Sequence, residues 1–588
     1  MNKPASPTLP DARFHPPERR DSLPTRRQAL LFFLKTSVLR RVRSLREVGK
    51  APAPLKKSPI PTEARVIAES RTPLYTTTSP EEWALQAGKV QNLRLAARAL
   101  DGSFAPANQT VSFWANVGRA TARRGFVRGR ELREGCVIPN LGGGLCQISN
   151  ALYDVALQAG AEIVERHAHT RKIPGSTAAA GRDATVFWNY VDLRFRSSVD
   201  TWLTAQLTRE ELIVRLLATE DLQPVARTVD ESTDEAAPVE TCETCGIGDC
   251  FRHASAAALP RSGGAAFLLD AYQPEFDTWL REQRQPGDHL LVPLDSRRYR
   301  LGPYRWSTSG FATIHQAPLA VVHRSLVSRK LASQGAPRQR ALLAMDHAMA
   351  TALARRLPPL ANHLTVSQNL LPFLWHDGWL GGRTFDVLMT RAPLRELEQQ
   401  LDRAAQAHPE SPTLADFRAP TEIVQWEAEA LAAASRWITP HSAIAPGRTH
   451  LLDWQLPKQA PIPRGTDVIF PASTLGRKGA YELREAARQL GNITIRLGGP
   501  ILESPNFWSG LNVQPAGENW LQNAAVVVLP AWVEHQPRRL LRAVAAGIPV
   551  IASEACGLKN VPGVTTIPCG DAEALKSAIT STLANKSA

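Results

Sequence analysis

Two long stretches of the C-terminal half alternate short apolar runs with helical runs, and this alternation constrains the fold more than any other feature of the sequence. The apolar runs are 265–269, 290–293, 319–322, 364–366 and 385–389, and then 467–470, 493–497, 525–529, 549–552 and 564–567. Parallel strands need a helical crossover between them, so this alternation is typical of doubly wound sheets. Three prolines within residues 456–465 separate the two stretches. The sequence therefore predicts two consecutive Rossmann-like α/β domains, over residues 263–455 and 456–588.

The first 72 residues are predicted to be a basic, partly disordered arm. Residues 1–71 hold 16 Lys and Arg against 6 Asp and Glu, whereas the whole chain has a formal net charge of +14. Because the arm accounts for most of the excess charge, we do not expect the protein to bind nucleic acid. Within the arm, residues 26–48 place apolar residues at helical spacing among many arginines, which predicts an amphipathic helix. Such a helix can bind an anionic membrane surface or dock on its own protein, and both alternatives stay open.

Residues 73–218 are predicted to form an α+β domain, since a helical stretch, a glycine-rich loop and alternating strands follow one another there. An acidic linker over residues 219–262 comes next and holds a cluster of four soft ligands, namely Cys242, Cys245, Cys250 and His253. Thiolates and an imidazole suit Zn²⁺ or an iron–sulfur centre. The cluster is more compact than common structural zinc sites, so redox-active or free thiols are the alternative.

The sequence LGGGLCQISN (141–150) is the most unusual local stretch of the chain. Three successive glycines permit a tight turn, and helical periodicity begins just after them. Cys146 is therefore expected near a helix N-terminus, where the helix dipole favours the thiolate. Together with His169 and Asp183 it could supply a nucleophile, a base and an orienting acid. A structural buried cysteine among structural histidines is the alternative.

The second α/β stretch carries features that suggest nucleotide-sugar chemistry. Gly476, Arg477 and Lys478 lie between a predicted strand and a predicted helix, where cations and helix-start amides can hold a diphosphate. Glu534 follows the predicted strand 525–529, and open α/β sheets bind ligands at the carboxyl ends of their strands. A helix, a glycine and a buried strand then follow within residues 540–553.

Three motifs of the central segment resemble the VanW-like family, which is named for an accessory protein of vancomycin-resistance gene clusters. They are GGGLCQISNALYDVAL (142–157), VERHAHTRKIPGS (164–176) and GRDATVFWNYVDLRF (181–195). The resemblance covers about residues 108–217 and implies a bacterial protein with a connection to the cell envelope. In this chain His169 is followed by Thr170, where the family typically has serine.

The features of the second α/β stretch, in their order and spacing, resemble the GT-B glycosyltransferases of the family-4 retaining type, over about residues 264–583. The resemblance implies that Lys478 and Arg477 bind the donor phosphates and that Glu534 contacts the donor sugar. The family has a second glutamate near the ribose, and here Arg542 stands in its place. The glycine-rich acceptor loop of the family has no clear counterpart, since the pair Gly381–Gly382 lies elsewhere in the chain.

We therefore predict a cytoplasmic protein with a VanW-like α+β domain followed by a GT-B pair of Rossmann-like domains. No apolar run is long enough to span a membrane, and seven cysteines in 588 residues are no disulfide framework. The predicted function is transfer of a sugar from a nucleotide donor to an envelope-related acceptor. The alternative is a non-catalytic accessory or binding protein of the VanW type with a degenerate GT-B module.

Overall fold

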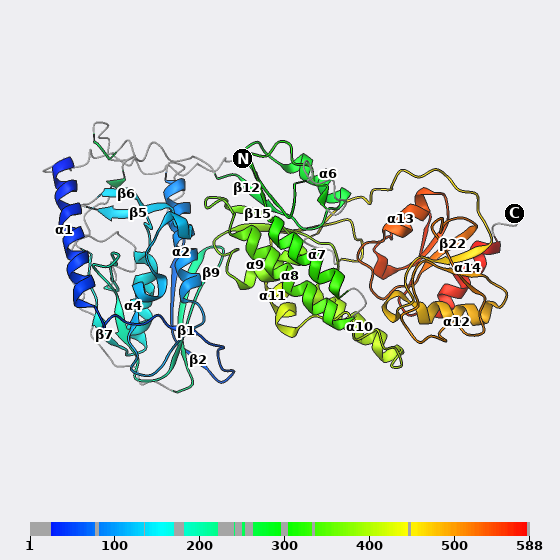
Figure 1. Ribbon diagram of the computed structural model, residues 1–588, viewed down its shortest axis with the longest axis horizontal. Helices are drawn as coiled ribbons and strands as arrows, with labels where there is room; N and C mark the ends of the chain where they lie inside the picture. The colour runs from blue at the N-terminus through cyan, green and yellow to red at the C-terminus, as the bar shows by residue number, and fades with distance from the viewer. Residues whose placement is uncertain are drawn as a thin grey trace, which may run out of the picture.

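The computed structural model describes residues 25–76, 82–133, 136–169, 181–220, 250–252, 263–295, 304–331, 335–444 and 449–584, together with the backbone of residues 240–241. Three lobes lie in a row along the longest axis, in chain order from the N-terminal helix to the C-terminus (Figure 1). The first lobe has an α+β fold, and each of the other two contains one parallel sheet. In the described part of the chain, no helix has both the length and the hydropathy of a membrane-spanning segment.

A five-stranded antiparallel sheet forms the centre of the N-terminal lobe, in the order β1-β3-β9-β10-β2. Its strands are β1 (Lys56–Lys57), β2 (Arg65–Pro73), β3 (Ser103–Ala105), β9 (Thr201–Leu207) and β10 (Glu211–Ala218). The helices that pack on it are α2 (Trp83–Leu100) and α4 (Cys146–Gln158). Two three-stranded sheets and a short helix complete the lobe, with β4 (Val111–Ser112), α3 (Phe113–Val117), β5 (Arg128–Arg133), β6 (Cys136–Leu141), β7 (Glu162–Glu165), β8 (Arg194–Arg196) and β11 (Glu240–Thr241).

Strands β1 and β2 lie within the residues that the sequence assigned to the basic arm. The inward-facing residues of β2 are Ala68, Ser70 and Thr72, which are buried but small or polar. Because they carry little apolar signal, the period-2 pattern of this strand is weak in the sequence. The folded lobe therefore begins before residue 73.

The predicted amphipathic helix is present as α1 (Arg26–Arg46), and it docks on the N-terminal lobe through its basic residues. Arg43 donates to both carboxylate oxygens of Glu165, at 2.7 and 2.8 Å. Glu47, directly after the helix, pairs with Arg194 at 2.5 Å. Most large apolar residues of the helix are more than half exposed, namely Leu30, Leu31, Phe33, Leu34, Val38 and Leu45, whereas Val42 of the predicted pattern is half-buried. The helix therefore docks with charged groups and turns an apolar surface outward.

A seven-stranded parallel sheet forms the middle lobe, in the order β14-β13-β12-β15-β16-β17-β18. The first strand of the lobe lies inside the sheet and the chain winds outward in both directions, which is the doubly wound arrangement. Its strands are β12 (Ala265–Leu268), β13 (His289–Val292), β14 (Thr313–Gln316), β15 (His363–Ser367), β16 (Thr384–Leu388), β17 (Arg436–Thr439) and β18 (Thr449–Leu451). Its helices are α6 (Pro274–Gln283), α7 (Pro318–Lys330), α8 (Ala336–Ala354), α9 (Leu371–His376), α10 (Leu394–Ala407) and α11 (Thr421–Ala433).

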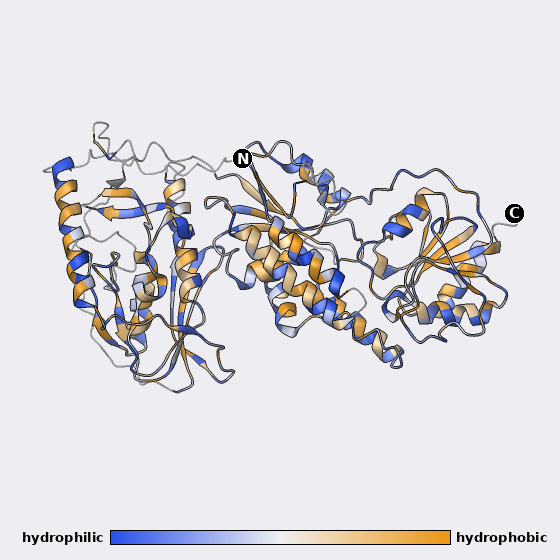
Figure 2. Cartoon of the chain, viewed as in Figure 1, coloured by the Kyte–Doolittle hydropathy of each residue, from blue (hydrophilic) through white to orange (hydrophobic). Residues whose placement is uncertain are grey.

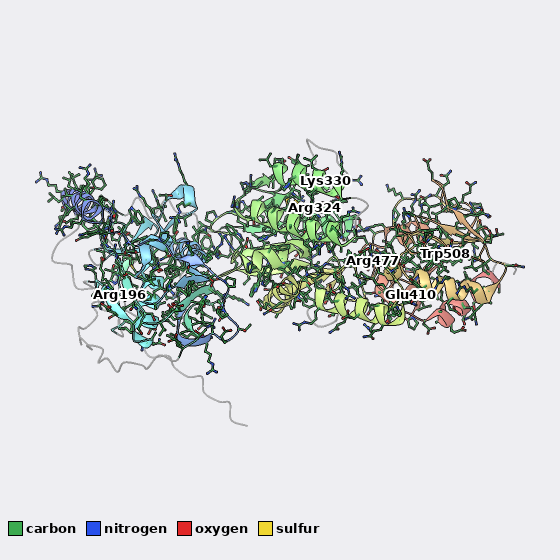
Figure 3. All side chains as sticks on the ribbon, turned by 60° about the horizontal axis from the view of Figure 1, so that its bottom comes forward. Arg196, Arg324, Lys330, Glu410, Arg477 and Trp508 are labelled. Atoms are coloured by element: carbon green, nitrogen blue, oxygen red, sulfur yellow. The ribbon has the colours of Figure 1, made fainter. Side chains whose placement is uncertain are left out.

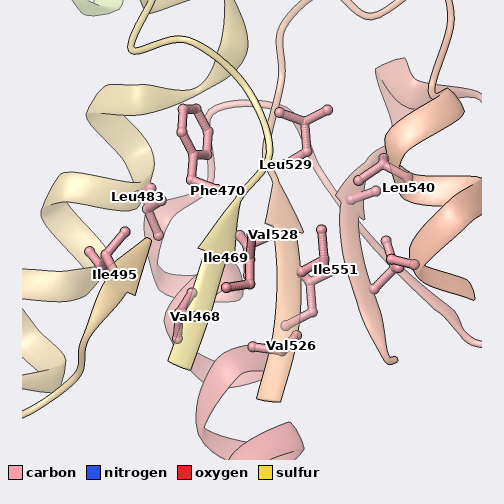
Figure 4. Close-up of a cluster of buried hydrophobic side chains, with 14 of the residues drawn as sticks. Val468, Ile469, Phe470, Leu483, Ile495, Val526, Val528, Leu529, Leu540 and Ile551 are labelled. Atoms are coloured by element: carbon pink, nitrogen blue, oxygen red, sulfur yellow. The ribbon is translucent and has the colours of Figure 1, made fainter. Parts of the chain in front are cut away.

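The C-terminal lobe repeats this arrangement with six parallel strands, in the order β21-β20-β19-β22-β23-β24. Its strands are β19 (Asp467–Phe470), β20 (Ile495–Leu497), β21 (Val513–Pro515), β22 (Ala524–Leu529), β23 (Val550–Ser553) and β24 (Val564–Ile567), and its helices are α12 (Ala480–Leu490), α13 (Arg538–Ala545) and α14 (Ala572–Ala584). The central strands β19, β22 and β23 are buried along their length because helices cover both faces of the sheet, and the interior of this lobe is mainly hydrophobic (Figure 2). Val468 and Val526, on the neighbouring strands β19 and β22, have no exposed surface (Figure 4). Both predicted Rossmann-like domains are confirmed, but the apolar run 319–322 was wrong as a strand, since it belongs to helix α7 and the strand before it is β14.

The glycine pair Gly381–Gly382 joins the N-terminal lobe to the middle lobe. Arg94 Nε donates to the Gly381 carbonyl oxygen at 2.7 Å, and the Gly382 amide donates to the Thr208 carbonyl oxygen at 2.8 Å. Gly382 has a φ of +69°, and a Cβ atom there would lie 2.5 Å from Val90 Cγ1. A side chain would therefore be both strained and obstructed at this position. The two glycines therefore allow the backbones of the two lobes to approach closely.

Candidate functional site

Lys478 and Glu534 form an ion pair at the carboxyl edge of the C-terminal sheet. Lys478 ends the 3₁₀ turn η4 (Gly476–Lys478) after β19, and Glu534 follows the adjacent strand β22. Lys478 Nζ lies 2.8 Å from Glu534 Oε2 and 3.1 Å from the Val533 carbonyl oxygen. Burial alone would raise the pKa of Glu534, but the charge and hydrogen bond of Lys478 outweigh it, so the pKa is lowered. The two side chains thus meet where α/β sheets bind their ligands.

Basic side chains from two lobes surround this ion pair. Arg477 and His535 belong to the C-terminal lobe, whereas Arg391 and His441 follow strands β16 and β17 of the middle lobe. Burial and the charges of the neighbouring arginines, Lys478 and His441 lower the pKa of His535 well below its usual value. His535 Nε2 is buried and has no hydrogen-bond partner among the described residues. The positive potential at this edge favours an anionic ligand.

Arg477 lies where the middle and C-terminal lobes meet (Figure 3). Its guanidinium carbon is 4.6 Å from the centre of the Phe417 ring, which belongs to the segment after α10. Burial lowers the pKa of Arg477, and the nearby carboxylates of Glu534 and Asp416 oppose this shift. A ligand that contacts this guanidinium must therefore approach beside an aromatic ring of the middle lobe.

The backbone amide of Gly476, which we expected to face a donor phosphate, is occupied by protein groups. It donates to Glu503 Oε1 at 2.7 Å and to Thr413 Oγ1 at 3.2 Å. Glu503 also accepts from Ser411 at 3.0 Å and from Tyr481 at 2.9 Å. A carboxylate of this chain thus stands at the amide where the sequence predicted an anionic ligand.

Arg542, which replaces the second glutamate of the family pattern, is an exposed residue on α13. Its Nε donates to Gln459 Oε1 at 3.2 Å. With Glu518 and Trp520 it lines a cavity of about 300 Å³. Arg542 is therefore turned toward the proline-rich segment 456–465.

A second cluster, in the N-terminal lobe, brings together Cys146, His169 and Asp183. His169 Nδ1 lies 2.5 Å from Asp183 Oδ1, and the His169 amide donates to the other carboxylate oxygen at 2.5 Å. The Cys146 sulfur lies 3.7 Å from Thr185 Oγ1, and the imidazole of His169 is near enough to lower the pKa of the thiol. Asp183 is fully buried, and the His169 side chain is about one-fifth exposed. The three predicted residues therefore meet in the order thiol, imidazole, carboxylate.

The charge state of this cluster is shifted toward an ion pair. Burial would raise the pKa of the Cys146 thiol, but hydrogen bonds and the charge of His169 lower it overall. Burial would lower the pKa of His169, but Asp183 and Cys146 raise it to about 10. Both shifts act toward a thiolate beside an imidazolium ion.

Three of the four predicted metal ligands, Cys242, Cys245 and His253, lie outside the described residues, so the predicted cluster stays a prediction. Cys250 is described and half-buried. Within the described ranges, no group of three or more His, Cys, Asp or Glu side chains is arranged to hold a metal ion.

Sequence reasoning missed Arg391, His441, His535 and Glu503. The first two lie in the middle lobe, far from the C-terminal motifs along the chain. Their contribution depends on how the two Rossmann-like domains face one another, and no local pattern reports that arrangement. His535 stood next to the predicted Glu534, and only its burial distinguishes it.

The chain has an α+β lobe followed by two Rossmann-like domains, and a basic site lies at the edge of the second parallel sheet. The pair of Rossmann-like domains has the GT-B architecture. Residues 88–217 match the family described as VanW like protein, and residues 507–585 match the family described as group 1 glycosyl transferases. The chain therefore contains a VanW-like domain and a group 1 glycosyltransferase domain. The first match begins before residue 108, where the resemblance was placed, and so includes most of α2.

The curated relatives match the VanW-like part of the chain. The Bacillus subtilis protein YoaR is 38% identical over 106 residues, which cover 18% of this chain and 34% of the relative. The vancomycin B-type resistance protein VanW of Enterococcus faecalis is 33% identical over 168 residues, which cover 27% of this chain and 60% of the relative. The chain thus spans less than two thirds of either relative.

Similar solved structures cover the two Rossmann-like domains at low identity. A sucrose-phosphate synthase from Thermosynechococcus elongatus has a TM-score of 0.35 and 15% identity, covering 55% of this chain and 90% of that chain. The Anabaena protein HepE in complex with UDP-glucose has a TM-score of 0.30 and 13% identity, covering 55% of this chain and 90% of that chain.

Proposed function

We propose that the two Rossmann-like domains transfer a sugar from a nucleotide donor to an envelope-related acceptor, with retention of configuration. The observation that carries the proposal is that Lys478 and Arg477 act on the buried carboxylate Glu534, while Arg391 and His441 of the middle lobe act on the adjacent His535. Basic groups from both domains suit a ligand that is bound between them and carries a diphosphate. The match to group 1 glycosyl transferases supports the reaction class.

In this proposal Lys478 and Arg477 neutralise the diphosphate as it leaves the sugar. The leaving group gains negative charge in the transition state, so cations placed beside it lower the barrier. Lys478 exchanges its present partner, Glu534, for a phosphate oxygen. The freed carboxylate then accepts hydrogen bonds from hydroxyl groups of the donor sugar. The ion pair is thus the resting form of a donor site.

Binding of the donor can be tested with the full chain by isothermal titration with UDP, GDP, CDP and dTDP and their glucose conjugates. We expect one nucleoside diphosphate to bind selectively and Lys478→Ala to weaken its binding at least tenfold. Lys576→Ala removes a lysine from an exposed pair with Glu573 on α14 and is the matched control. Absence of binding by every nucleotide would contradict the proposal.

A non-catalytic binding module is the second candidate, and the occupied Gly476 amide favours it. Glu503 fills the anion position at η4, and Phe417 covers one face of Arg477. A GT-B unit that no longer turns over can keep such internal contacts in place of substrate contacts. Product formation separates the two candidates: nucleotide binding without release of nucleoside diphosphate, over a panel of acceptors, favours the module.

We also propose that α1 brings the protein to an anionic membrane surface. Its outward residues combine large apolar side chains, such as Leu31 and Leu34, with exposed basic residues, such as Arg27 and Lys35. The basic residues complement anionic headgroups while the apolar side chains enter the headgroup boundary. An envelope acceptor anchored in lipid would then be presented to the transferase.

Sedimentation with phosphatidylglycerol and phosphatidylcholine vesicles tests this surface. We expect the protein to bind only the anionic vesicles, and the double variant Leu31→Asp, Leu34→Asp to stay in solution. Leu319→Asp is the matched control, because Leu319 is also exposed but lies on α7 of the middle lobe. Self-association of wild type without vesicle binding would assign the apolar face to a second copy of the chain and overturn the proposal.

A further inference from the structure

We propose that Cys146, His169 and Asp183 form an acyl-transfer site in the VanW-like domain. Cys146 is the nucleophile, His169 is the base and acid, and Asp183 is a positioning residue that acts through His169. The acyl donor is an ester or an amide, and the acyl acceptor is water or an amine. The site lies in a different lobe from the proposed sugar-transfer site, so the two activities are independent.

The glycine turn before α4 positions the nucleophile. Gly142 and Gly144 have φ angles of +78° and +94°, which only glycine adopts readily. A Cβ atom at Gly144 would lie 2.2 Å from Lys89 Cγ, so this turn also requires the absence of a side chain. The helix begins at Cys146, and the Gln147 and Ser149 amides donate to the Gly144 and Leu145 carbonyl oxygens, at 3.1 and 3.2 Å. The positive end of the helix dipole therefore lies beside the thiol and favours negative charge there.

Two polar residues of α4 fix the position of the segment that contains Asp183 relative to Cys146. Ser149 Oγ donates to the Ala184 carbonyl oxygen, and Asn150 Oδ1 accepts from the Ala184 amide at 2.8 Å. Ala184 directly follows Asp183, so these contacts fix the carboxylate relative to Cys146. This explains why serine and asparagine follow the cysteine within one helical turn in the CQISN motif.

The Asp183 carboxylate orients the imidazole of His169 relative to the Cys146 thiol. Asp183 engages Nδ1 and the backbone amide of His169, so the carboxylate does not use Nε2, and His169 in turn lowers the pKa of the Cys146 thiol. A fully buried carboxylate in this position stabilises the imidazolium form. The Thr185 hydroxyl and the Val186 amide also interact with the sulfur of Cys146 and add to the stabilisation of a thiolate.

Cys556 and Cys569 show what burial does to a thiol that has no imidazole beside it. Burial raises the pKa of Cys556 to about 12, and it also raises the pKa of Cys569. Cys146 is shifted in the opposite direction, although burial acts on it in the same sense. A structural cysteine would need no such compensation, and so the contrast favours a reactive thiol.

The chemistry balances with the named co-reactants. The Cys146 thiolate attacks the acyl carbon, a thioester bond forms, and the bond to the alcohol or amine breaks as His169 donates its proton to the leaving group. Water or an amine then attacks the thioester while His169 accepts its proton, and the thiolate leaves again. No oxidant, reductant or metal takes part in either step.

Two measurements on the full chain test the site. Iodoacetamide labelling, read by peptide mass spectrometry, should modify Cys146 at least tenfold faster at pH 6 than an ordinary thiol, with rates that change little up to pH 8. p-Nitrophenyl acetate should release a burst of one equivalent of p-nitrophenol and leave an acetyl group on Cys146. Cys146→Ala should abolish both signals, and Cys569→Ala is the matched control.

The roles of His169 and Asp183 must be tested with a measurement that a loss of packing alone would not change. His169→Gln and Asp183→Asn should slow labelling at pH 6 by tenfold or more and move its half-maximum toward pH 9, while each variant melts as one folded protein. If Asp183→Asn does not fold, His169→Gln alone decides the question. Ordinary pH dependence of Cys146 labelling in wild type, together with no acetyl adduct, would overturn the proposal.

Discussion

Arg538 of the C-terminal Rossmann-like domain and Glu275 of the middle lobe form an ion pair with two hydrogen bonds, at 2.7 and 2.5 Å. The side chain of Glu275 is fully buried, whereas that of Arg538 is about one-third exposed. The backbone amide of Gln455 also donates to Glu275 Oε1, at 2.9 Å. The pair therefore fixes the closure of the two domains next to the segment that connects them.

Removing the arginine should destabilise the protein. Arg538→Ala leaves a buried carboxylate with only the Gln455 amide, so we expect a loss of about 2 kcal/mol in the free energy of unfolding. Urea denaturation of the full chain measures it. Lys559→Ala, an exposed lysine of the same lobe, should change stability by less than about 0.5 kcal/mol. Equal stability of both variants would contradict a role of the pair in closure.

The contact between the N-terminal and middle lobes can be tested with two glycines of the same backbone conformation. Gly382 and Gly517 have φ angles of +69° and +68°, but only Gly382 has neighbouring atoms where a Cβ would stand. Gly382→Ala should cost about 1–3 kcal/mol more than Gly517→Ala, because both share the backbone strain and only the first adds an overlap. Differential scanning calorimetry compares the two, and similar losses would argue against close packing at Gly382.

Burial lowers the pKa of Lys89 to about 7, which predicts a pH-dependent stability. Between pH 7 and 10.5 the unfolded chain binds this proton more tightly, so the stability of wild type rises with pH over that window. Lys89→Met should therefore stabilise the protein at pH 7, by up to about 1.4 kcal/mol per unit of pKa shift, and the gain should vanish near pH 10.5. Urea unfolding at both pH values measures it, and a gain independent of pH would contradict the shift.

Glu503 competes with an external anion for the Gly476 amide. Glu503→Ala exposes this amide and should increase the affinity for a nucleoside diphosphate several-fold, while lost hydrogen bonds lower stability by about 2 kcal/mol. Isothermal titration gives the affinity. Glu410→Ala removes an exposed carboxylate of the neighbouring segment and serves as the control. Weaker nucleotide binding by Glu503→Ala would instead make Glu503 part of the scaffold that shapes the site.

Metal content tests the predicted cluster of Cys242, Cys245, Cys250 and His253. Purified protein should carry about one equivalent of zinc or iron per chain, since four ligands hold one ion. Cys245→Ser should abolish it, and Cys569→Ser should not. Metal-free wild type with readily titrated thiols would exclude the cluster as a metal site. Elemental analysis by mass spectrometry provides the measurement.

The two parallel sheets were predictable because strands buried on both faces leave continuous apolar runs in the sequence. Strand β2 was missed because its buried positions hold Ala68, Ser70 and Thr72. Residues 184–187, read as a strand from their alternation, instead form an irregular segment with one bridge between Phe187 and Val191. Ala184 and Thr185 of that segment contact Ser149, Asn150 and Cys146 of α4. The alternation of apolar and polar residues cannot predict such contacts.

The candidate sites were predictable only in part. Cys146, His169 and Asp183 could be named as residue types, but their contacts depend on how α4 packs against the segment that follows Gly181. Lys478 and Glu534 lie after adjacent strands, and the rule for strand ends brought them together. Glu503 reaches Gly476 from a loop after β20, so nothing in the sequence near either residue indicated their hydrogen bond.

The orientation of α1 bears on how this chain can be shortened. Removing residues 1–50 would discard the exposed leucines and make the protein less prone to aggregate. The same cut would remove Arg43, which is the counter-charge of Glu165 and lies 3.8 Å from the buried Asp192. Removing residues 1–50 should therefore increase solubility and at the same time lower the folding stability of the protein. In a truncated form Arg194 alone would remain as the arginine beside both carboxylates, at 3.4 Å from Glu165 and 2.9 Å from Asp192.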